Sequence, residues 1–288
     1  MDTERIIVSV SGGKDSTAVC LHLFELGYTK DQFDRVFMDT GWEHKSTYQY
    51  LDELEKTIGP IIRLKAAIPM KEEYREYIEY FENKIGFESP FIRRVFKYTG
   101  FPSRVIKWCT TELKIEVVKK YFDSLDYSFI NAVGIRREES QRRSAMSEWE
   151  YNNHFDCDVW RPIIFWKEKQ VIDIHHRFNL VPNNLYLNGS SRVGCYPCIN
   201  SRKQEIKNLS PDRIDLIREL EQVITKLRIE RLGKDQLEAT FFQSKRKGEI
   251  MNIDSVVSWS NTAFGGRQFE LFDTTIPTCE KWGLCNLK

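Results

Sequence analysis

The hydrophobic residues in the first third of the chain fall into short apolar runs that alternate with longer amphipathic segments. The short runs, which have the length and composition of strands, are residues 5–10, 35–40 and 61–66. The longer segments, which carry apolar residues at helical spacing, are residues 15–27, 44–59 and 69–86. The first two end at a glycine, a common C-terminal stop, and the third opens with Pro69 at a first-turn position. Strands that alternate with helices in this way predict a parallel α/β sheet.

The remainder of the chain is less regular. We predict helices over residues 112–125, 167–180 and 210–233 and a strand over 127–134, with Ser210 as the N-cap of the longest helix. Residues 182–204 form a loop-rich stretch, and the tail from 249 is rich in Gly, Ser, Asn and aromatic residues. The pattern predicts an α/β domain over residues 1–205, followed by a helical C-terminal extension with a cysteine-containing tail over 206–288.

The composition narrows the class of protein. Of the 288 residues, 41% are hydrophobic and 30% are charged, which is typical of a soluble globular protein. The 43 Lys and Arg residues nearly balance the 42 Asp and Glu residues, so net charge gives no argument for a nucleic-acid partner. No secretory signal and no membrane span is recognisable, so we expect a cytoplasmic protein with no membrane partner. In that compartment the seven cysteines, one pair in a C-x-x-C arrangement, favour metal or redox chemistry over disulfides.

The junction between the first strand and the first helix carries the clearest chemistry. It reads S-G-G-K-D-S over residues 11–16. Gly12 and Gly13 let the backbone approach an anion, Lys14 adds a positive charge, and the helix N-terminus adds N–H donors. The segment matches neither the Walker A pattern nor G-x-G-x-x-G. A tight turn that needs glycine for steric reasons is the alternative, but the whole combination favours a phosphate cradle.

At this point the sequence resembles a known family. S-G-G-K-D-S after the first strand looks like the PP-loop of the N-type ATP pyrophosphatases. Four further segments resemble the phosphoadenosine-phosphosulfate (PAPS) reductase branch: MDTGWEHKST (38–47), WCTTELKIEVV (108–118), GIRREESQRR (134–143) and the stretch from WRPIIFW to GCYPC (160–198). The resemblance covers about residues 5–205 and implies a Rossmann-like parallel sheet of the adenine nucleotide alpha-hydrolase type. It also implies ATP and Mg²⁺ as cofactors, with cleavage between the α- and β-phosphates.

The resemblance implies a set of site residues. Those expected to bind the nucleotide are Ser9, Ser11, Gly12, Gly13, Lys14, Asp15, Ser16, Asp39, Thr40, Gly134 and Arg136. Those expected to take part in the chemistry are Lys14, Asp15, Cys109 and Arg136. Asp39 follows the second strand and either meets the ribose or a Mg²⁺ ion or caps the next helix. Arg137, Arg142 and Arg143 either bind an anionic substrate with Arg136 or form a solvated basic face.

The cysteines predict a metal centre. In adenylylsulfate (APS) reductases a Cys-Cys pair and a later C-x-x-C hold a [4Fe–4S] cluster, whereas here Trp108 precedes Cys109. We therefore expect Cys109, Cys195, Cys198 and Cys285 to hold the metal, favouring [4Fe–4S] over Zn²⁺. The competing set replaces Cys109 by Cys279, which gives a zinc clasp and leaves Cys109 as a reactive thiol. Cys20, on the apolar face of the first helix, is expected in the core.

The C-terminal tail helps to distinguish between the possible reactions. The reductases end in E-C-G-L-H, whose cysteine attacks the substrate sulfur, but this chain ends K-W-G-L-C-N-L-K. Trp282 then stands at the nucleophile position, which argues against sulfonucleotide reduction. The sequence is also similar to DNA phosphorothioation proteins of the DndC and SspD type, which implies ATP-dependent sulfur insertion into the DNA backbone. The implied partners are a cysteine desulfurase and other proteins of a modification system. The alternatives are an APS or PAPS reductase, a tRNA thiolation enzyme and a non-catalytic nucleotide-binding module.

Two segments offer positive charge for a nucleic-acid partner. Residues 90–108 interleave Arg93, Arg94, Lys97, Arg104 and Lys107 with aromatic residues, and residues 241–249 add Lys245, Arg246 and Lys247. Cations mixed with aromatic side chains are typical of grooves that bind single strands. A solvated charged face is the alternative, and DNA is the favoured partner through the resemblance.

Overall fold

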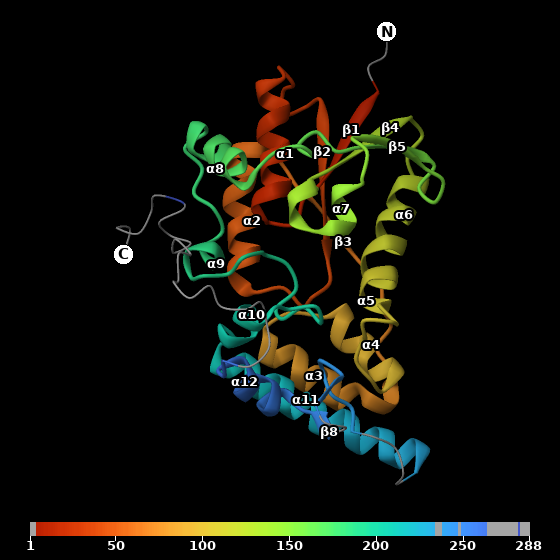
Figure 1. Cartoon of the computed structure of the whole chain (residues 1–288). Helices are drawn as coiled ribbons and strands as arrows, with labels where there is room; N and C mark the ends of the chain where they lie inside the picture. The colour runs from red at the N-terminus through yellow and green to blue at the C-terminus, as the bar shows by residue number, and fades with distance from the viewer. Residues whose placement is uncertain (1–3, 234–237, 247–248, 264–281, 283–288) are drawn as a thin grey trace.

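A six-stranded sheet lies at the centre of the protein, and the computed structural model describes residues 4–233, 238–246, 249–263 and 282. The strand order is β3-β2-β1-β4-β6-β5 (Figure 1). The strands are β1 (Arg5–Ser9), β2 (Phe33–Asp39), β3 (Ile62–Lys65), β4 (Phe129–Val133), β5 (Trp149–Asn152) and β6 (Cys157–Trp160). Neighbouring strands are parallel except β5, which pairs antiparallel with β6 at one edge. The predicted Rossmann-like α/β class is confirmed, whereas β5 and β6 are elements that the sequence pattern did not reveal.

Helices cover both faces of the sheet. Ile6 and Val8 of β1 pack into a cluster with α1 (Lys14–Glu25), α2 (Lys45–Ile58) and α8 (Glu168–Arg177). Ile7, which lies between them, packs on the other face against α6 (Glu116–Asp123). This division follows from the strand geometry, because successive side chains point to opposite faces. The two layers of helices are visible on either side of the sheet in Figure 1.

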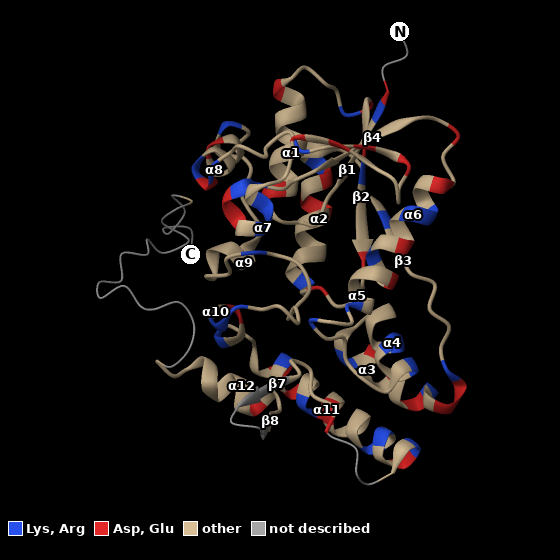
Figure 2. Cartoon of the chain, turned by 45° about the vertical axis from the view of Figure 1, so that its right-hand side comes forward, with Lys and Arg blue, Asp and Glu red and all other residues tan. Residues whose placement is uncertain are grey.

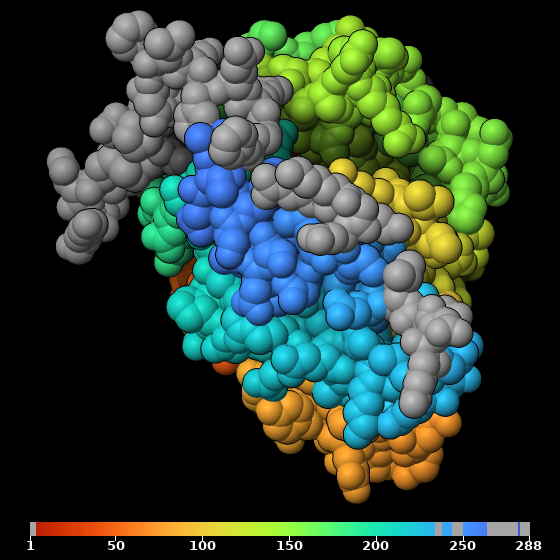
Figure 3. All heavy atoms as spheres, turned by 60° about the horizontal axis from the view of Figure 1, so that its bottom comes forward, coloured from red at the N-terminus to blue at the C-terminus, as the bar shows by residue number. Residues whose placement is uncertain are grey.

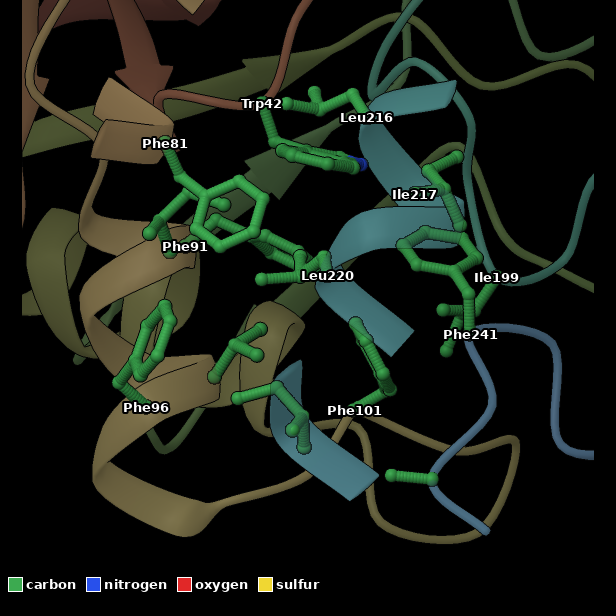
Figure 4. Packing of buried hydrophobic residues seen from close by; sticks show 14 of the residues in the cluster. Trp42, Phe81, Phe91, Phe96, Phe101, Ile199, Leu216, Ile217, Leu220 and Phe241 are labelled. Carbon is green, nitrogen blue, oxygen red and sulfur yellow. The ribbon is translucent and has the colours of Figure 1, made fainter. Parts of the chain in front are cut away.

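A second group of helices packs below the sheet. Its members are α3 (Arg75–Ile85), α4 (Pro90–Tyr98), α10 (Lys203–Lys207), α11 (Pro211–Leu232) and α12 (Ile253–Ser260). Trp42 lies at the centre of their core, with its ring 4.5 Å from that of Phe91 and 5.8 Å from that of Phe241 (Figure 4). Leu216 and Leu220 of α11 complete the same cluster. Helices α11 and α12 spread over the lower face of the molecule, with α3 at its edge (Figure 3).

This lower core bears on the predicted domain boundary. Trp42 and Phe91 come from the first 205 residues, whereas Leu220 and Phe241 come from the extension, and all four belong to one hydrophobic cluster. The boundary at residues 205 and 206 stays a prediction, but apolar packing continues across it.

Several local details differ from the sequence prediction. The helix expected from Pro69 begins later, with the 3₁₀ turn η1 (Glu72–Tyr74) leading into α3. Ser210 does occupy the N-cap position of α11, but its side chain accepts no capping hydrogen bond. The helix expected at 112–125 begins earlier, as α5 (Trp108–Thr110), and continues through a π-helical segment, η2 (Thr111–Ile115), into α6. The other short elements are η3 (Arg137–Glu139), α7 (Gln141–Ser144), α9 (Asn184–Leu187), β7 (Ser244–Arg246) and β8 (Glu249–Met251). Within the described ranges, no helix combines the length and the apolar character needed to cross a membrane.

Candidate functional site

The loop between β1 and α1 is built as a cradle. Gly12 has a φ of +71°, a conformation that favours glycine. The Ser16 hydroxyl closes the loop, because it accepts from the backbone N–H of Ser11 at 3.1 Å and donates to the Gly13 carbonyl at 3.1 Å. Gly13 is the N-cap of α1 and has no side chain to cap the helix. The first N–H groups of α1 therefore point into the cradle, as an anion site requires.

The glycines here are also required by close packing. A Cβ on Gly12 would lie 3.1 Å from the Thr47 side chain, and the hydroxyl of Thr47 is buried without a hydrogen-bond partner among the described residues. A Cβ on Gly134 would lie 2.7 Å from the backbone of Asp15 and Ser16. Gly134 thus lets the end of β4 touch the first turn of α1. Glycine is therefore required at position 134 for steric reasons. Contact of Gly134 with a nucleotide stays a prediction.

Lys14 and Arg136 are both held at the cradle. The Lys14 side chain is 7% exposed, and its Nζ lies 3.8 Å from Asp15 and 3.6 Å from Glu168. Arg136 is 4% exposed and donates through Nε to Asp15 at 2.5 Å, with Glu138 as its second carboxylate partner. Burial works to lower the pKa of Arg136, but these two carboxylates raise it overall, so the guanidinium stays charged. The structure brings together Lys14, Asp15 and Arg136, as the sequence predicted.

The neighbouring arginines have other contacts. Arg137 donates to the Met146 carbonyl at 2.9 Å and lies 4.5 Å from the centre of the Phe165 ring. Arg143 pairs with Glu139, and Arg142 is exposed. Among these four arginines, and within the part of the chain that the structure describes, only Arg136 forms a hydrogen bond or ion pair with the phosphate loop.

The end of β2 supplies a second polar cluster beside the cradle. Asp39 accepts from the backbone N–H of Gly41 at 2.8 Å and from the Tyr48 hydroxyl at 2.7 Å, and it lies 3.6 Å from Lys65. The N-cap of α2 is His44, so the alternative in which Asp39 caps that helix is wrong. Thr40 is buried, with its hydroxyl donating to Glu43 at 2.7 Å. Ser9 donates to Asn131 at 3.5 Å.

Three of the predicted metal ligands share one environment. Cys109, Cys195 and Cys198 all pack against the lower core, and Cys195 forms an isolated β-bridge with Glu43. Burial raises the pKa of Cys195 to about 12, an effect that the nearby Lys114 ammonium opposes. The pKa of Lys114 is raised, chiefly through Cys195 and further through Glu43 and the other two thiols. Lys114 is therefore a half-buried cation beside the thiols, and its charge partly offsets the effect of burial on the pKa of Cys195.

A complete ligand set is not present in the part of the chain that the structure describes. There, no three His, Cys, Asp or Glu side chains are arranged to hold a metal ion. Cys279 and Cys285 lie outside the described residues. The centre made by Cys109, Cys195, Cys198 and Cys285 therefore stays a prediction, as does its competitor. Cys20 is buried in the core, as expected.

The sequence prediction missed residues that hold this region in place. Arg213 of α11 is buried, with its guanidinium 3.6 Å from the centre of the Trp42 ring, and it donates to the Tyr196 carbonyl at 2.5 Å. Burial lowers the pKa of Arg213 to about 9. Arg213 of the extension thereby links the C-x-x-C loop to the segment between β2 and α2. Lys114 lies in the segment WCTTELKIEVV (108–118), five residues after Cys109. The sequence did not connect these two residues, because an ordinary helix would not place their side chains on one side.

The predicted nucleic-acid segments are only partly free for a ligand. Arg93 pairs with Glu82 at 2.8 Å and Arg94 with Glu112 at 2.7 Å, so two of the five cations in 90–108 have internal partners. Arg104 and Lys107 are exposed. Basic and acidic residues are interspersed along the chain in Figure 2. The side chains of Lys245 and Arg246 and the whole of Lys247 lie outside the described part of the chain.

Comparison with known proteins decides the family. Residues 5–201 match the family described as "Phosphoadenosine phosphosulfate reductase domain". The chain belongs to this family. The match agrees with the segments that carry the resemblance, which is thereby confirmed at the level of the PAPS reductase-like domain.

Several known proteins are similar to this chain over more than half of its length. An uncharacterised 37.8 kDa protein of Escherichia phage 186 is 30% identical, over 97% of this chain and 96% of that protein. An uncharacterised protein of Methanocaldococcus jannaschii is 30% identical, over 74% of this chain but only 42% of its own length. An adenosine 5'-phosphosulfate reductase of Neisseria meningitidis is 27% identical, over 56% of this chain and 59% of that enzyme. Among solved structures, a PAPS reductase of Candida auris is 17% identical, with a TM-score of 0.49, over 68% of this chain and 84% of that one.

Proposed function

We propose that this protein is a PP-loop enzyme that uses ATP and Mg²⁺ to adenylate an acceptor for sulfur insertion. The observation that carries the proposal is the cradle, in which Lys14, Asp15 and Arg136 meet at the N-terminus of α1, where the N-cap residue Gly13 has no side chain. The fit to a polyphosphate rests on Gly12, whose φ of +71° favours glycine, and on the hydroxyl of the nearby Thr47, which is buried without a hydrogen-bond partner among the described residues.

Each residue has a role that follows from its position. Bound ATP with Mg²⁺ would supply an electrophilic α-phosphorus and a pyrophosphate leaving group. Lys14 and the first N–H groups of α1 stabilise the charge that develops on the leaving oxygens. Arg136 orients Asp15 at the mouth of the cradle. Asp39, which lies 3.6 Å from Lys65, would hold Mg²⁺ or meet the ribose.

The acceptor that we favour is a nonbridging phosphate oxygen of DNA. Adenylation converts this oxygen, a poor leaving group, into part of an AMP leaving group. A sulfur nucleophile from a cysteine desulfurase partner can then attack the DNA phosphorus and displace AMP. Cys109, Cys195, Cys198 and Cys285 would hold a [4Fe–4S] cluster or Zn²⁺. Trp282 at the reductase nucleophile position supports adenylation over sulfonucleotide reduction, because an indole cannot attack sulfur.

A surface suited to a nucleic acid lies near the thiols. A cavity of about 600 Å³ lies between α4, the segment after it and the C-terminal half of α11. Its lining includes the aromatic rings of Tyr98 and Trp108 and the guanidinium groups of Arg228 and Arg231. Tyr98 is exposed, whereas Trp108 is buried against Phe91, and the carboxylates of Glu112 and Glu238 line the same cavity. An exposed ring beside two arginines is the feature of this cavity that supports a single-stranded nucleic acid as partner.

The test is a product assay on protein purified without oxygen. The protein receives Mg²⁺ and ATP labelled at the α-phosphate, with and without DNA, cysteine desulfurase and cysteine. We expect AMP and pyrophosphate to form, AMP formation to increase with DNA, and Lys14→Ala to abolish both products. Lys120→Ala, which removes an exposed lysine of α6, is the matched control and should keep full turnover.

The same assay separates the alternatives. The similarity to an adenosine 5'-phosphosulfate reductase of Neisseria meningitidis favours a second candidate function, that of a sulfonucleotide reductase. Intact ATP together with sulfite formed from APS or PAPS and thioredoxin would replace our proposal by that one. Stimulation by tRNA in place of DNA would indicate a tRNA thiolation enzyme. ATP that binds without turnover under every condition would indicate a nucleotide-binding module.

A further inference from the structure

The side chain of Tyr186, on α9, lies directly over the phosphate loop. The backbone N–H of Lys14 donates to the Tyr186 hydroxyl oxygen at 3.0 Å. The Cβ that Gly13 lacks would lie 3.3 Å from the same oxygen. Burial raises the pKa of Tyr186 far above its ordinary value, so the hydroxyl is neutral. A neutral oxygen of the chain therefore lies where the N-terminus of α1 would otherwise bind an oxygen of an anion.

The ammonium group of Lys14 is also occupied by the chain itself. Its Nζ donates to the backbone carbonyl of Ser191 at 3.2 Å and lies 4.9 Å from the centre of the Tyr186 ring. The carbonyl of Val193 is 3.8 Å from the Cβ position of Gly13. The carboxylates of Asp15 and Glu168 lie 3.8 and 3.6 Å from the Lys14 Nζ, whereas a bound phosphate oxygen is charged and can also accept a direct hydrogen bond from the ammonium group. A polyphosphate can therefore compete for Lys14, but only where these groups give way.

Trp282 lies behind Tyr186. Its side chain is 2% exposed, with its ring 6.1 Å from that of Tyr186, and it meets His175 edge-on at 5.2 Å. His176 stacks on the indole at 6.4 Å. His175 is fully buried, and its Nε2 has no hydrogen-bond partner among the described residues. The indole thus fills the space into which Tyr186 would otherwise withdraw.

We propose that Tyr186 and Trp282 are positioning residues of the anion site. The Tyr186 hydroxyl holds the place of a phosphate oxygen at the N-terminus of α1, and Trp282 keeps Tyr186 there. Pyrophosphate, or the polyphosphate of a nucleotide, binds by displacing this hydroxyl. The inference rests on the proposed function, because it takes the cradle to be the site of a phosphorylated ligand.

The test measures the affinity of pyrophosphate by calorimetry for the whole chain and its variants. Tyr186→Phe keeps the ring and removes the competing oxygen, so we expect binding about two- to tenfold tighter, which is the net value of one hydrogen bond. Trp282→Leu loosens Tyr186 without removing the hydroxyl and should tighten binding by a smaller factor. A residue that only supports the fold would weaken binding when replaced. Thermal unfolding of each variant confirms that it is folded.

A second readout follows the displacement itself. Pyrophosphate should change the fluorescence of Trp282, and this change should be absent in Trp282→Phe. Wild-type binding that Lys14→Ala abolishes, combined with unchanged or weaker binding by Tyr186→Phe, overturns this inference and leaves the proposed function standing. Absence of pyrophosphate and ATP binding in wild type and in every variant overturns the proposed function, and this inference with it.

Discussion

Glu221 of α11 is a buried carboxylate that joins two later segments to the long helix. One of its oxygens accepts from the backbone N–H of Phe241 at 2.8 Å, and the other accepts from that of Ile253 at 2.9 Å. Burial raises the pKa of Glu221 from 4.5 to about 7, although both hydrogen bonds act in the opposite direction. The folded protein therefore keeps this proton at a pH where the unfolded chain has lost it.

The consequence is a defined dependence of stability on pH. Because the folded state binds the proton more tightly, the free energy of unfolding falls as pH rises from about 4.5 through about 7. At about 1.4 kcal/mol per pKa unit, the difference between the two values amounts to about 3 kcal/mol from this one group.

Glu221→Gln tests this reasoning. Glutamine has one acceptor oxygen, so one of the two N–H groups loses its partner at a cost of about 1–3 kcal/mol at every pH. The variant cannot ionise, so we expect it to be less stable than wild type near pH 5 and to recover most of the difference near pH 8. Urea unfolding at a series of pH values measures both effects.

The control is a glutamate on the same helix. Glu219 is exposed and pairs with Lys84, which lowers the pKa of its carboxyl group, so Glu219→Gln should leave the pH dependence above pH 5 unchanged. Parallel curves for wild type and Glu221→Gln between pH 5 and 8 would refute the reasoning, because the buried carboxyl would then not be the titrating group.

Two further substitutions test the packing. Leu220→Ala, at a fully buried position of the lower core, should lower the free energy of unfolding by about 2–5 kcal/mol in chemical denaturation; a loss below about 1 kcal/mol would contradict the shared core. Gly134→Ala places a methyl group 2.7 Å from the backbone of Asp15, so it should cost about 1–3 kcal/mol and weaken pyrophosphate binding; wild-type stability and affinity would show that the contact is not close.

The sequence predicted strands and helices best where consecutive residues are buried. Strand β1 has buried apolar residues over Ile6–Val8, and β2 has Val36 and Phe37 buried at its centre, so these strands and the helices after them were predicted within a few residues. Strand β5 is exposed along most of its length and carries alternating aromatic and polar residues, so no apolar run marked it. Pro69 was misleading because a proline is accepted equally in a loop and in a first helical turn.

The site was predictable to the extent that it is local. The phosphate loop spans six consecutive residues, and its chemistry can be recognised from their order alone. Tyr186 lies 172 residues from the N–H group that it accepts, and Arg213 lies 171 residues from the Trp42 carbonyl. Contacts of this kind depend on how the finished sheet and the lower helices meet, which no local pattern records.

The π-helical segment between Cys109 and α6 sets which side chains share a side of that helix. In a regular helix, residues five positions apart are offset by about 140° around the axis. A π-turn closes its hydrogen bonds over five residues, so Cys109 and Lys114 can face the same environment. Loss of a single residue from 110–113 would give a regular helix in which the two residues, then four positions apart, are offset by only about 40° and still share a side. In an alignment of relatives, a one-residue gap at this point, with every cysteine retained, would therefore be compatible with the same pairing of thiol and cation in a regular helix.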